Sequence, residues 1–449
     1  MSTYSYIIIL TFLFILFIQI TTIQIPLTTL NESPKTPLRN LLVKQLLSDD
    51  YNYLIMKTDI CIGNPKQCFN VVYDTGSSYL ILGLKNTNSK FNTLFNPNNS
   101  TTYSSSDSSF YSIPYKQDVI NAKEGKDVFS INEKHNSKYL FSFLNSFNNS
   151  EYYDYDGILG FGNHYPKRDV DNSFDERFSI VHYLKNEGII NKKIFGHGYN
   201  DRRKGILFIG EEPSTMNDGY FKCKVEPFIA YINKWYCQCS KIYTGKGNHF
   251  FGHKRIIVFD TGYKYIRAFY HDARVIFETY IEESNGKCYM EDFYKNSSNE
   301  AAYSKLYCDL DVDKEIFSEI VFDFFGNKMT LLKRDLFRKV YKNGKEMYEM
   351  NMLGDNNSED FVWNLGQIVL KNYDMVFSYE DNTVGFRKNA NYSGGDWVSI
   401  AILFLVLVAL IIGTIFLYKN RKKFMSKKIT DSDIENFGKE KGAQLQNLI

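Results

Sequence analysis

Short runs of apolar and aromatic residues alternate with polar clusters along most of the chain, at intervals of about ten residues. The stretch NPNNSTTYSSSDSS, residues 96–109, is one such polar cluster. Apolar runs separated by turn-forming residues at this spacing are typical of a protein built from many short β-strands. We therefore expect an all-β fold.

Two apolar segments are too long for strands of this kind. The first, IIILTFLFILFIQI at residues 7–20, has the length of a signal-peptide core and is shorter than a full membrane span. We predict a signal peptide over residues 1–23, although residues 1–6 contain no Lys or Arg. An uncleaved N-terminal anchor is the alternative.

The second segment, residues 397–418, has 22 residues without a charge, which is long enough to cross a bilayer. Six positive charges follow within residues 419–428, and such a bias keeps that side of a span in the cytoplasm. We expect a single-pass transmembrane helix with a cytoplasmic tail at 419–449. The rest of the chain then lies in the lumen of a secretory, endolysosomal or vacuolar compartment, or at the cell surface.

Glycosylation sequons agree with this topology, because all seven precede the predicted span. They start at Asn31, Asn98, Asn99, Asn148, Asn296, Asn356 and Asn391.

Length and charge limit the classes of function. With 449 residues the chain has room for two or three domains. The 53 basic and 51 acidic residues nearly balance, so the charge gives no indication of a nucleic-acid partner.

The seven cysteines suit an oxidising compartment. If Asn64-Pro65 forms the turn of a hairpin, Cys61 and Cys68 face each other and can form a disulfide. Cys288 and Cys308 are a second candidate pair. The remaining three, Cys223, Cys237 and Cys239, leave one thiol over.

Metal binding is a weaker interpretation of the same region. Cys237-Gln-Cys239 has no second pair of suitable ligands nearby, and no acidic residue lies between His249 and His253. We expect no metal and no cofactor.

The strongest chemical signal is an Asp-Thr-Gly that occurs twice. It lies in VVYDTGSSYLILG, residues 71–83, and again in IIVFDTGYKYI, residues 256–266. Each copy follows a run of β-branched and aromatic residues, and Asp74 and Asp260 are 260 − 74 = 186 positions apart. One copy alone predicts only a turn after a strand. Two copies about one domain length apart predict two similar lobes that bring the turns together.

Two facing carboxylates have a specific use. When they lie about 3 Å apart they cannot both ionise cheaply, so they share a proton. One can then accept a proton from water while the other donates a proton to a carbonyl oxygen.

At these residues the chain resembles the pepsin-like aspartic proteases, and the resemblance covers most of residues 50–388. It implies a bilobal fold with lobes at 51–213 and 214–392 and an active site in the cleft between them. It also implies catalytic roles for Asp74 and Asp260 and a monomer acting on peptide or protein substrates. The supporting residues of the two loops would be Thr75, Gly76, Ser77, Thr261 and Gly262.

Further stretches match the family in order. DYDGILGFG at 154–162 resembles the segment that closes the first active-site loop, through Ile158-Leu159-Gly160. GILFIGEEP at 205–213 resembles a strand of the sheet that joins the lobes, and KWYCQCSKIYTG at 234–245 contains the characteristic Trp235. The block at 362–386 resembles the family's C-terminal segment. The hairpin that closes over substrate would be residues 110–131, with Tyr115 as its tyrosine.

Several positions depart from the family pattern. Ser77 can donate a hydrogen bond to Asp74, whereas Tyr263 stands at the matching position beside Asp260. Lys264, which follows, would compensate through its charge or point into solvent. The family's glycine-rich hairpin tip is Lys116-Gln117-Asp118 here, and three other positions differ: Ile81 for a Trp, Asn364 for an apolar residue and Gln367 for an Asp.

A short propeptide is expected at residues 24–50, where IPLTTL and LRNLLVKQLL resemble the strand and helix of family propeptides. Lys35, Arg39 or Lys44 would supply the basic group that blocks the dyad. The resulting hypothesis is a membrane-anchored aspartic endopeptidase. The alternatives are a catalytically impaired relative that binds peptides or protein partners, and a surface protein that uses the fold as a scaffold.

Overall fold

The computed structural model describes residues 43–49, residues 56–389 with gaps, and residues 408, 411–418 and 420 of a C-terminal helix. The gaps are 116–117, 132–134, 150–152, 164–177, 202–203, 213–215, 217–218, 226–233, 245–248, 252–253, 295–300 and 357–360. By its internal contacts the chain divides into two units, 1–41 and 42–449, and every described residue belongs to the second. The predicted signal peptide therefore lies outside the described residues.

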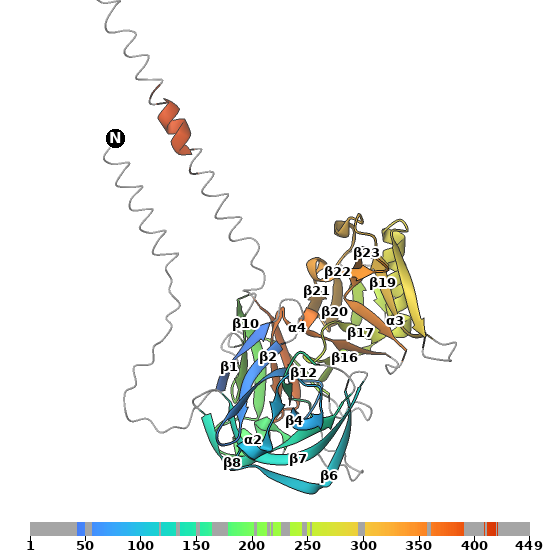
Figure 1. Cartoon of the computed structure of the whole chain (residues 1–449). Helices are drawn as coiled ribbons and strands as arrows, with labels where there is room; N and C mark the ends of the chain where they lie inside the picture. The colour runs from blue at the N-terminus through green and yellow to red at the C-terminus, as the bar shows by residue number, and fades with distance from the viewer. Residues whose placement is uncertain are drawn as a thin grey trace, which may run out of the picture. The chain divides into compact units, whose positions relative to one another are not determined.

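The described residues are mostly β-strands, as the sequence predicts (Figure 1). The largest sheet has 14 strands. In spatial order they are β12 (Phe221–Lys224), β27 (Thr383–Lys388), β26 (Tyr373–Ser378), β10 (Ile194–Asp201), β11 (Lys204–Ile209), β1 (Val43–Asp49), β2 (Met56–Ile62), β3 (Gln67–Asp74), β9 (Gly157–Gly160), β4 (Leu80–Asn88), β8 (His135–Asn148), β7 (Asp118–Ile131) and β6 (Ser104–Tyr115), with β5 (Leu94–Phe95) beside β4.

Two smaller sheets follow in the second half of the chain. The nine-stranded sheet runs β13 (Tyr236–Cys239), β16 (Arg255–Phe259), β25 (Val362–Leu365), β17 (Ile266–Phe269), β24 (Met352–Asp355), β19 (Ala301–Cys308), β23 (Lys345–Met350) and β22 (Phe337–Lys342), with β18 (Cys288–Tyr294) beside β19. The four-stranded sheet runs β15 (His249–Phe251), β14 (Lys241–Thr244), β20 (Ile320–Phe324) and β21 (Asn327–Leu331). Helices are α2 (Ile180–Asn186), α3 (Tyr270–Glu283) and α4 (Gln367–Leu370), with short 3-10 turns at Pro97–Asn99, Lys314–Ile316 and Lys333–Asp335.

One three-strand arrangement occurs twice. In the first sheet β3 pairs parallel with β9, which pairs antiparallel with β4. In the second sheet β16 pairs parallel with β25, which pairs antiparallel with β17. Each arrangement begins with a strand that leads into an Asp-Thr-Gly. The repeat in sequence is therefore also a repeat in structure.

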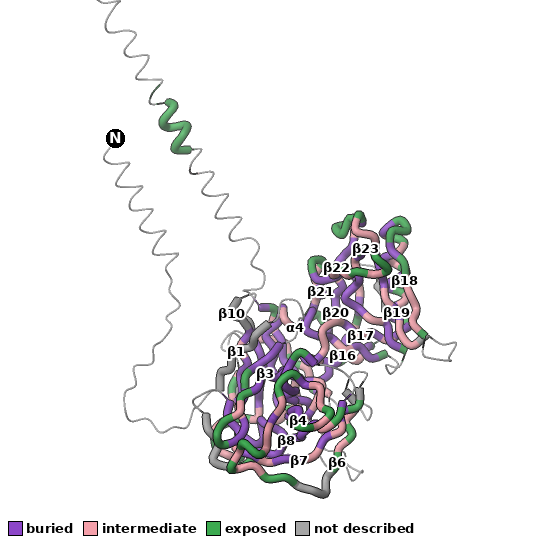
Figure 2. Tube along the Cα trace, in the orientation of Figure 1, coloured by how far each residue is buried: buried purple, intermediate pink, exposed green. Residues whose placement is uncertain are grey.

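Strands β3 and β4 are covered on both faces, which explains their nearly continuous apolar sequences. Val71 and Tyr73 point into the larger hydrophobic core, whereas Val72 between them points into a smaller one. Leu80 and Leu82 belong to the larger core and Ile81 to the smaller. Figure 2 shows this burial as purple along β3 and β4. Alternate side chains of β3 and β4 are thus packed in two different cores, which fixes the first Asp-Thr-Gly loop between these strands.

The first sheet is completed by strands from the other end of the chain. β26 pairs with β10, and β27 pairs with both β26 and β12. Because β11 pairs with β10 and β1, it connects these late strands to the early ones. The prediction that residues 205–213 include a strand of the joining sheet is confirmed for β11.

Helix α3 is the main departure from the all-β expectation among the described residues. Tyr270, Ala273, Ile276, Phe277 and Tyr280 are buried on one face, with helical spacing. This face packs against β18, β19 and β24. The helix is thus an amphipathic cover for the second sheet.

Two predicted segments are only partly described. Residues 43–47 end the stretch compared with a propeptide helix, but Val43–Asp49 forms strand β1 between β11 and β2. Of the predicted span at 397–418, residue 408 and residues 411–418 are helical, and Ile411–Tyr418 are exposed. Within the described part of the chain, no helix has both the length and the apolar character needed to cross a bilayer.

Three disulfides are present. Cys61 and Cys68 face each other across the β2–β3 hairpin, and Cys288 and Cys308 face each other across β18 and β19, so both predicted bridges are confirmed. The third bridge joins Cys223 to Cys237, which the sequence left open. Because Cys237 is part of this bridge, it is not a thiolate that could bind a metal.

Cys239 is the remaining thiol, and it is buried with its Sγ near the carbonyl oxygens of Lys241 and Asp323. Burial raises the pKa of this thiol to about 12. We predict that a thiol-alkylating reagent leaves the native protein unlabelled at neutral pH and labels one site, Cys239, after unfolding without reductant. Mass mapping of the labelled peptides checks this. Labelling of Cys223, or of two or more sites, would contradict the assigned pairing.

Candidate active site

Both Asp-Thr-Gly loops begin at the end of a buried strand and are closed by a second segment. Asp74 is the last residue of β3, and its carbonyl accepts a hydrogen bond from Phe161 N at 2.7 Å. Asp260 directly follows β16, and its N–H donates to Leu365 O at 3.0 Å. The prediction that residues 158–160 close the first loop is confirmed by the β3–β9 pairing.

The two loops are joined by four crossed hydrogen bonds between their threonines. Thr75 N donates to Thr261 Oγ1 at 2.9 Å, and Thr261 N donates to Thr75 Oγ1 at 3.0 Å. Each hydroxyl also donates to the opposite strand, Thr75 Oγ1 to Phe259 O and Thr261 Oγ1 to Tyr73 O, both at 2.8 Å. Because both threonines are fully buried, these bonds fix one loop against the other.

The glycines let each aspartate reach across to the other loop. A methyl group added at Gly76 would overlap the Asp260 carboxylate, and one added at Gly262 would overlap the Asp74 carboxylate. Only a residue without a Cβ allows this approach. The two carboxylates therefore face each other across the join, as the doubled motif predicts.

Local donors orient the carboxylates. Gly76 N donates to Asp74 Oδ1 and the Ser77 hydroxyl donates to Asp74 Oδ2, both at 2.7 Å. Gly262 N donates to Asp260 Oδ1 at 3.1 Å. The predicted role of Ser77 as donor is confirmed. Asp74 is 1% exposed and Asp260 is partly exposed.

The groups beneath Asp74 stay uncharged over a wide pH range. Burial, with the nearby Tyr379 and Asp74, raises the pKa of Tyr73 well above its usual value. Burial lowers the pKa of His197 to about 4, and its ring lies 5.7 Å from that of Tyr73. Neither group places a charge under the dyad at moderately acidic pH.

The predicted substrate hairpin exists as β6 and β7, which pair from Ser104–Lys126 to Tyr115–Asp118. Tyr115 is therefore the last paired residue before the tip, of which residues 116–117 lie outside the described residues. Ile81, in place of the family's Trp, is fully buried in the smaller core beside Ile120 of β7.

Two polar side chains support the loops in ways that the sequence did not predict. Lys234 Nζ donates to Gly76 O, and Gln367 Nε2 donates to Thr261 O at 2.7 Å. Gln367 stands where the family has Asp, and only the amide form can donate to that carbonyl. Its neighbour in the motif, Asn364, is partly exposed on β25.

Trp235, the Trp characteristic of the family, is fully buried. Its Nε1 donates to Phe161 O at 2.6 Å, and its ring lies 5.7 Å from that of Phe195 and 5.4 Å from that of Phe377. It therefore joins the segment after β9 to the central sheet.

A buried ion pair holds the strand that leads to Asp260. Arg255, the first residue of β16, binds Asp272 of α3 through Nε at 2.7 Å and Nη2 at 3.0 Å. Trp363 Nε1 of β25 donates to the same carboxylate at 2.9 Å. Helix α3, β16 and β25 are thus fixed together behind the second loop. No sequence pattern predicted this contact.

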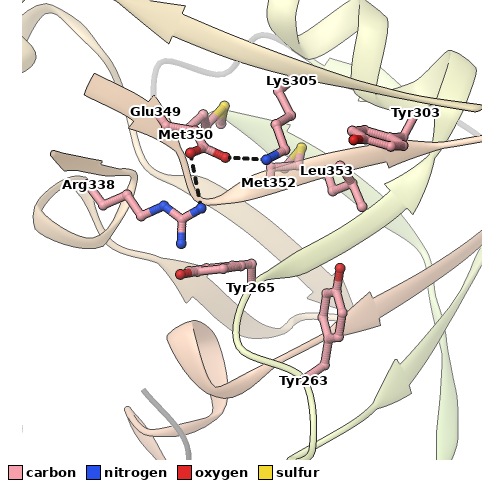
Figure 3. Close-up of a pocket in the computed structure, with 9 residues that line it drawn as sticks. All are labelled: Tyr263, Tyr265, Tyr303, Lys305, Arg338, Glu349, Met350, Met352 and Leu353. Atoms are coloured by element: carbon pink, nitrogen blue, oxygen red, sulfur yellow. Dashed lines mark hydrogen bonds and ion pairs between the residues drawn. The ribbon is translucent and has the colours of Figure 1, made fainter. Parts of the chain in front are cut away.

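Tyr263 does not take the place of a small hydroxyl donor. Figure 3 shows its ring extending into a pocket, toward Tyr303 and Leu353. Burial raises the pKa of Tyr263 to about 12, with Arg267 lowering it and Asp355 and Asp260 raising it. The phenol is therefore a neutral hydrogen-bond donor. Lys264 is partly exposed, and its carbonyl accepts from Ile368 N at 2.9 Å.

The repeated strand arrangement and the facing aspartates define a site of the aspartic protease type. Residues 55–389 match the family model for eukaryotic aspartyl proteases, and the chain belongs to this family. It is 25% identical to gastricsin of Oryctolagus cuniculus over 350 residues, which cover 73% of this chain and 80% of the relative. It is 36% identical to gastricsin of Cavia porcellus over 168 residues, 36% of this chain and 41% of the relative. It is 27% identical to embryonic pepsinogen of Gallus gallus over 198 residues, 40% of this chain and 49% of the relative.

The crossed threonine bonds generate a stability prediction. Thr75→Val keeps the side-chain shape but leaves Thr261 N–H and Phe259 O buried without these partners, so we expect a loss of about 2 kcal/mol or more in the free energy of unfolding. Urea denaturation of the purified protein measures it. Thr75→Ser, which keeps the hydroxyl, is the control and should lose clearly less. Equal losses in the Val and Ser variants would show that the hydroxyl bonds contribute little.

Proposed function

We propose that the protein is an aspartic endopeptidase in which Asp74 and Asp260 activate a water molecule to hydrolyse peptide bonds. The observation that carries this proposal is that each aspartate's carboxylate lies against the glycine of the other loop. Membership of the aspartyl protease family supports the same chemistry. No metal or cofactor takes part in the proposed reaction.

The proposed reaction uses one proton shared by the pair. The ionised carboxylate accepts a proton from water, whose oxygen attacks the peptide carbonyl, while the protonated carboxyl donates to the carbonyl oxygen. Proton transfer to the amide nitrogen then breaks the C–N bond. The titration belongs to the pair rather than to either residue. Ser77 and Gly76 N stabilise negative charge on Asp74 by donating to it.

We also propose that an N-terminal segment within residues 24–50 keeps the protein inactive until it is removed. The name of the chicken relative, embryonic pepsinogen, supports a zymogen. Strand β1 pairs with β11 and β2, so cleavage before Val43 would keep the sheet intact, whereas removal of β1 would open two edges.

The proposed location is a membrane of the secretory or endolysosomal system, or the cell surface, with the protease region lumenal or extracellular. The uncharged 22-residue segment at 397–418 and the positive charges after it support a type I anchor. The three disulfides agree with an oxidising compartment.

The dyad is tested by charge-neutral substitutions of the same shape. We expect Asp74→Asn and Asp260→Asn each to lower kcat/KM on a peptide substrate at least about a hundredfold, because each removes one partner of the acid–base pair. The measurement covers roughly pH 3 to 7, the range in which such a pair can hold one proton. It uses the ectodomain after removal of the N-terminal segment.

Asp59→Asn, on the exposed face of β2, is the matched control and should retain full activity. Retained activity in Asp260→Asn would exclude the shared-proton mechanism. A wild-type protein without cleavage anywhere in this pH range would instead favour a protein that only binds peptides.

The anchor is tested by topology. In sealed microsomes, added protease should remove only a C-terminal tag fragment of a few kilodaltons, because the tail at 419–449 faces the outside of the vesicle and the bilayer shields the rest. Immunoblotting for tags at both ends of the mature chain measures this. Digestion of the ectodomain with protection of the tail would reverse the proposed orientation.

A further inference from the structure

A pocket of about 200 Å³ lies beside the second Asp-Thr-Gly loop. Tyr263, which lines it, lies three residues after Asp260. The other lining residues are Tyr265 and residues of β19, β22, β23 and β24 (Figure 3). The lining residues are Tyr263, Tyr265, Tyr303, Lys305, Arg338, Glu349, Met350, Met352 and Leu353. This volume is below the roughly 300 Å³ of the smallest typical small-molecule sites. A pocket of this volume can hold one side chain of a larger ligand.

The charged residues of this pocket do not balance. Glu349 is buried and binds two cations, Lys305 Nζ through Oε1 at 2.9 Å and Arg338 Nη2 through Oε2 at 3.0 Å. Two cations and one carboxylate leave a net charge of +1. The neighbouring Arg267–Asp355 ion pair adds no net charge. The pocket therefore favours a negative or strongly accepting group over a positive one.

Arg338 is held ready for such a group. Its guanidinium lies over the ring of Tyr265, 4.0 Å from the centroid, so its orientation is restricted. Its Nε is buried and finds no hydrogen-bond acceptor among the described residues, and a third of its side chain remains exposed. A buried donor without an acceptor is unfavourable until a ligand supplies one.

Tyr263 connects this pocket to the dyad. It follows Asp260 by three residues in the sequence and lines the same pocket as Arg338. The phenol is neutral at any working pH and can donate a hydrogen bond into the pocket. A side chain of an extended peptide bound at Asp260 would thus meet Tyr263 first and Arg338 behind it.

We propose that this pocket selects substrates with a Glu or Asp side chain near the scissile bond, and that Arg338 is its specificity-determining residue. The substrate carboxylate would accept a charge-assisted hydrogen bond from Arg338 and a second from the Tyr263 phenol. An uncharged Gln would accept weaker bonds, and a Lys would be repelled. This inference rests on the proposed peptidase function, since it names the substrate class of that site.

The first experiment measures cleavage. A peptide library screened with the activated ectodomain identifies a cleaved sequence, and kcat/KM is then compared for versions with Glu, Gln or Lys at each position. We expect one position at which kcat/KM of the Glu peptide exceeds that of the Gln peptide by about tenfold and that of the Lys peptide by more. The Glu-to-Gln ratio of kcat/KM should fall toward one as the pH drops below about 4.3, where the substrate Glu becomes protonated.

Variants then locate the preference. Arg338→Gln should bring the Glu-to-Gln ratio of kcat/KM close to one, and Arg338→Lys should restore part of that ratio. Lys339→Gln is the matched control, because the adjacent β22 side chain is exposed and alternates to the other face. Glu349→Gln should increase the ratio, since it raises the pocket charge, and misfolding would not produce such a gain.

The second experiment separates this inference from the proposed function. Binding of the same Glu and Gln peptides to Asp74→Asn and to Asp74→Asn/Arg338→Gln is measured by fluorescence anisotropy, without catalysis. A tenfold Glu preference that Arg338→Gln abolishes supports the pocket even if wild type cleaves nothing, in which case the peptidase proposal alone fails. Cleavage without a Glu preference, or with a preference that Arg338→Gln leaves unchanged, overturns the pocket assignment.

Discussion

The crossed hydrogen bonds between Thr75 and Thr261 are the constraint on which the rest of the site depends. They join residues 186 positions apart and bury both hydroxyls. Because each hydroxyl both accepts from and donates to the opposite segment, neither loop can satisfy its backbone alone. The approach of each carboxylate to the other loop's glycine follows from this register. An error of one residue in either strand would separate the aspartates.

The backbone of the site is nearly symmetric, but its side chains are not. Around Asp74 the loop has a small donor, Ser77, and strand β4 packs Ile81 into the smaller core. Beside Asp260 the matching residue is Tyr263, whose large side chain lines the pocket that contains Arg338. The second half has kept the loop geometry while its surroundings have changed. The two carboxyls of an acid–base pair have different roles, so similar loop backbones with different neighbouring side chains suit such a pair.

Local sequence signals predicted the parts of this structure that depend on local geometry. The hairpin numbering placed Cys61 opposite Cys68, and the doubled Asp-Thr-Gly placed Asp74 and Asp260 together. The pairing of Cys223 with Cys237 was left open, because their strands belong to different sheets and the choice among three thiols depends on tertiary packing. The bonds of Lys234 and Gln367 to the loops, and the pocket around Arg338, join residues far apart in sequence. No spacing rule connects such residues.

The position of β26 and β27 has a consequence for synthesis. These strands are among the last described, yet β26 covers the edge of β10, which is made about 180 residues earlier. While the chain is being synthesised, β10 therefore presents an open row of backbone donors and acceptors. Its own apolar residues Ile194 and Phe195 lie along this edge strand. Such an edge recruits foreign strands. A nascent or truncated molecule that ends before Tyr373 would be prone to aggregate, so the cell must shield it until the last two strands arrive.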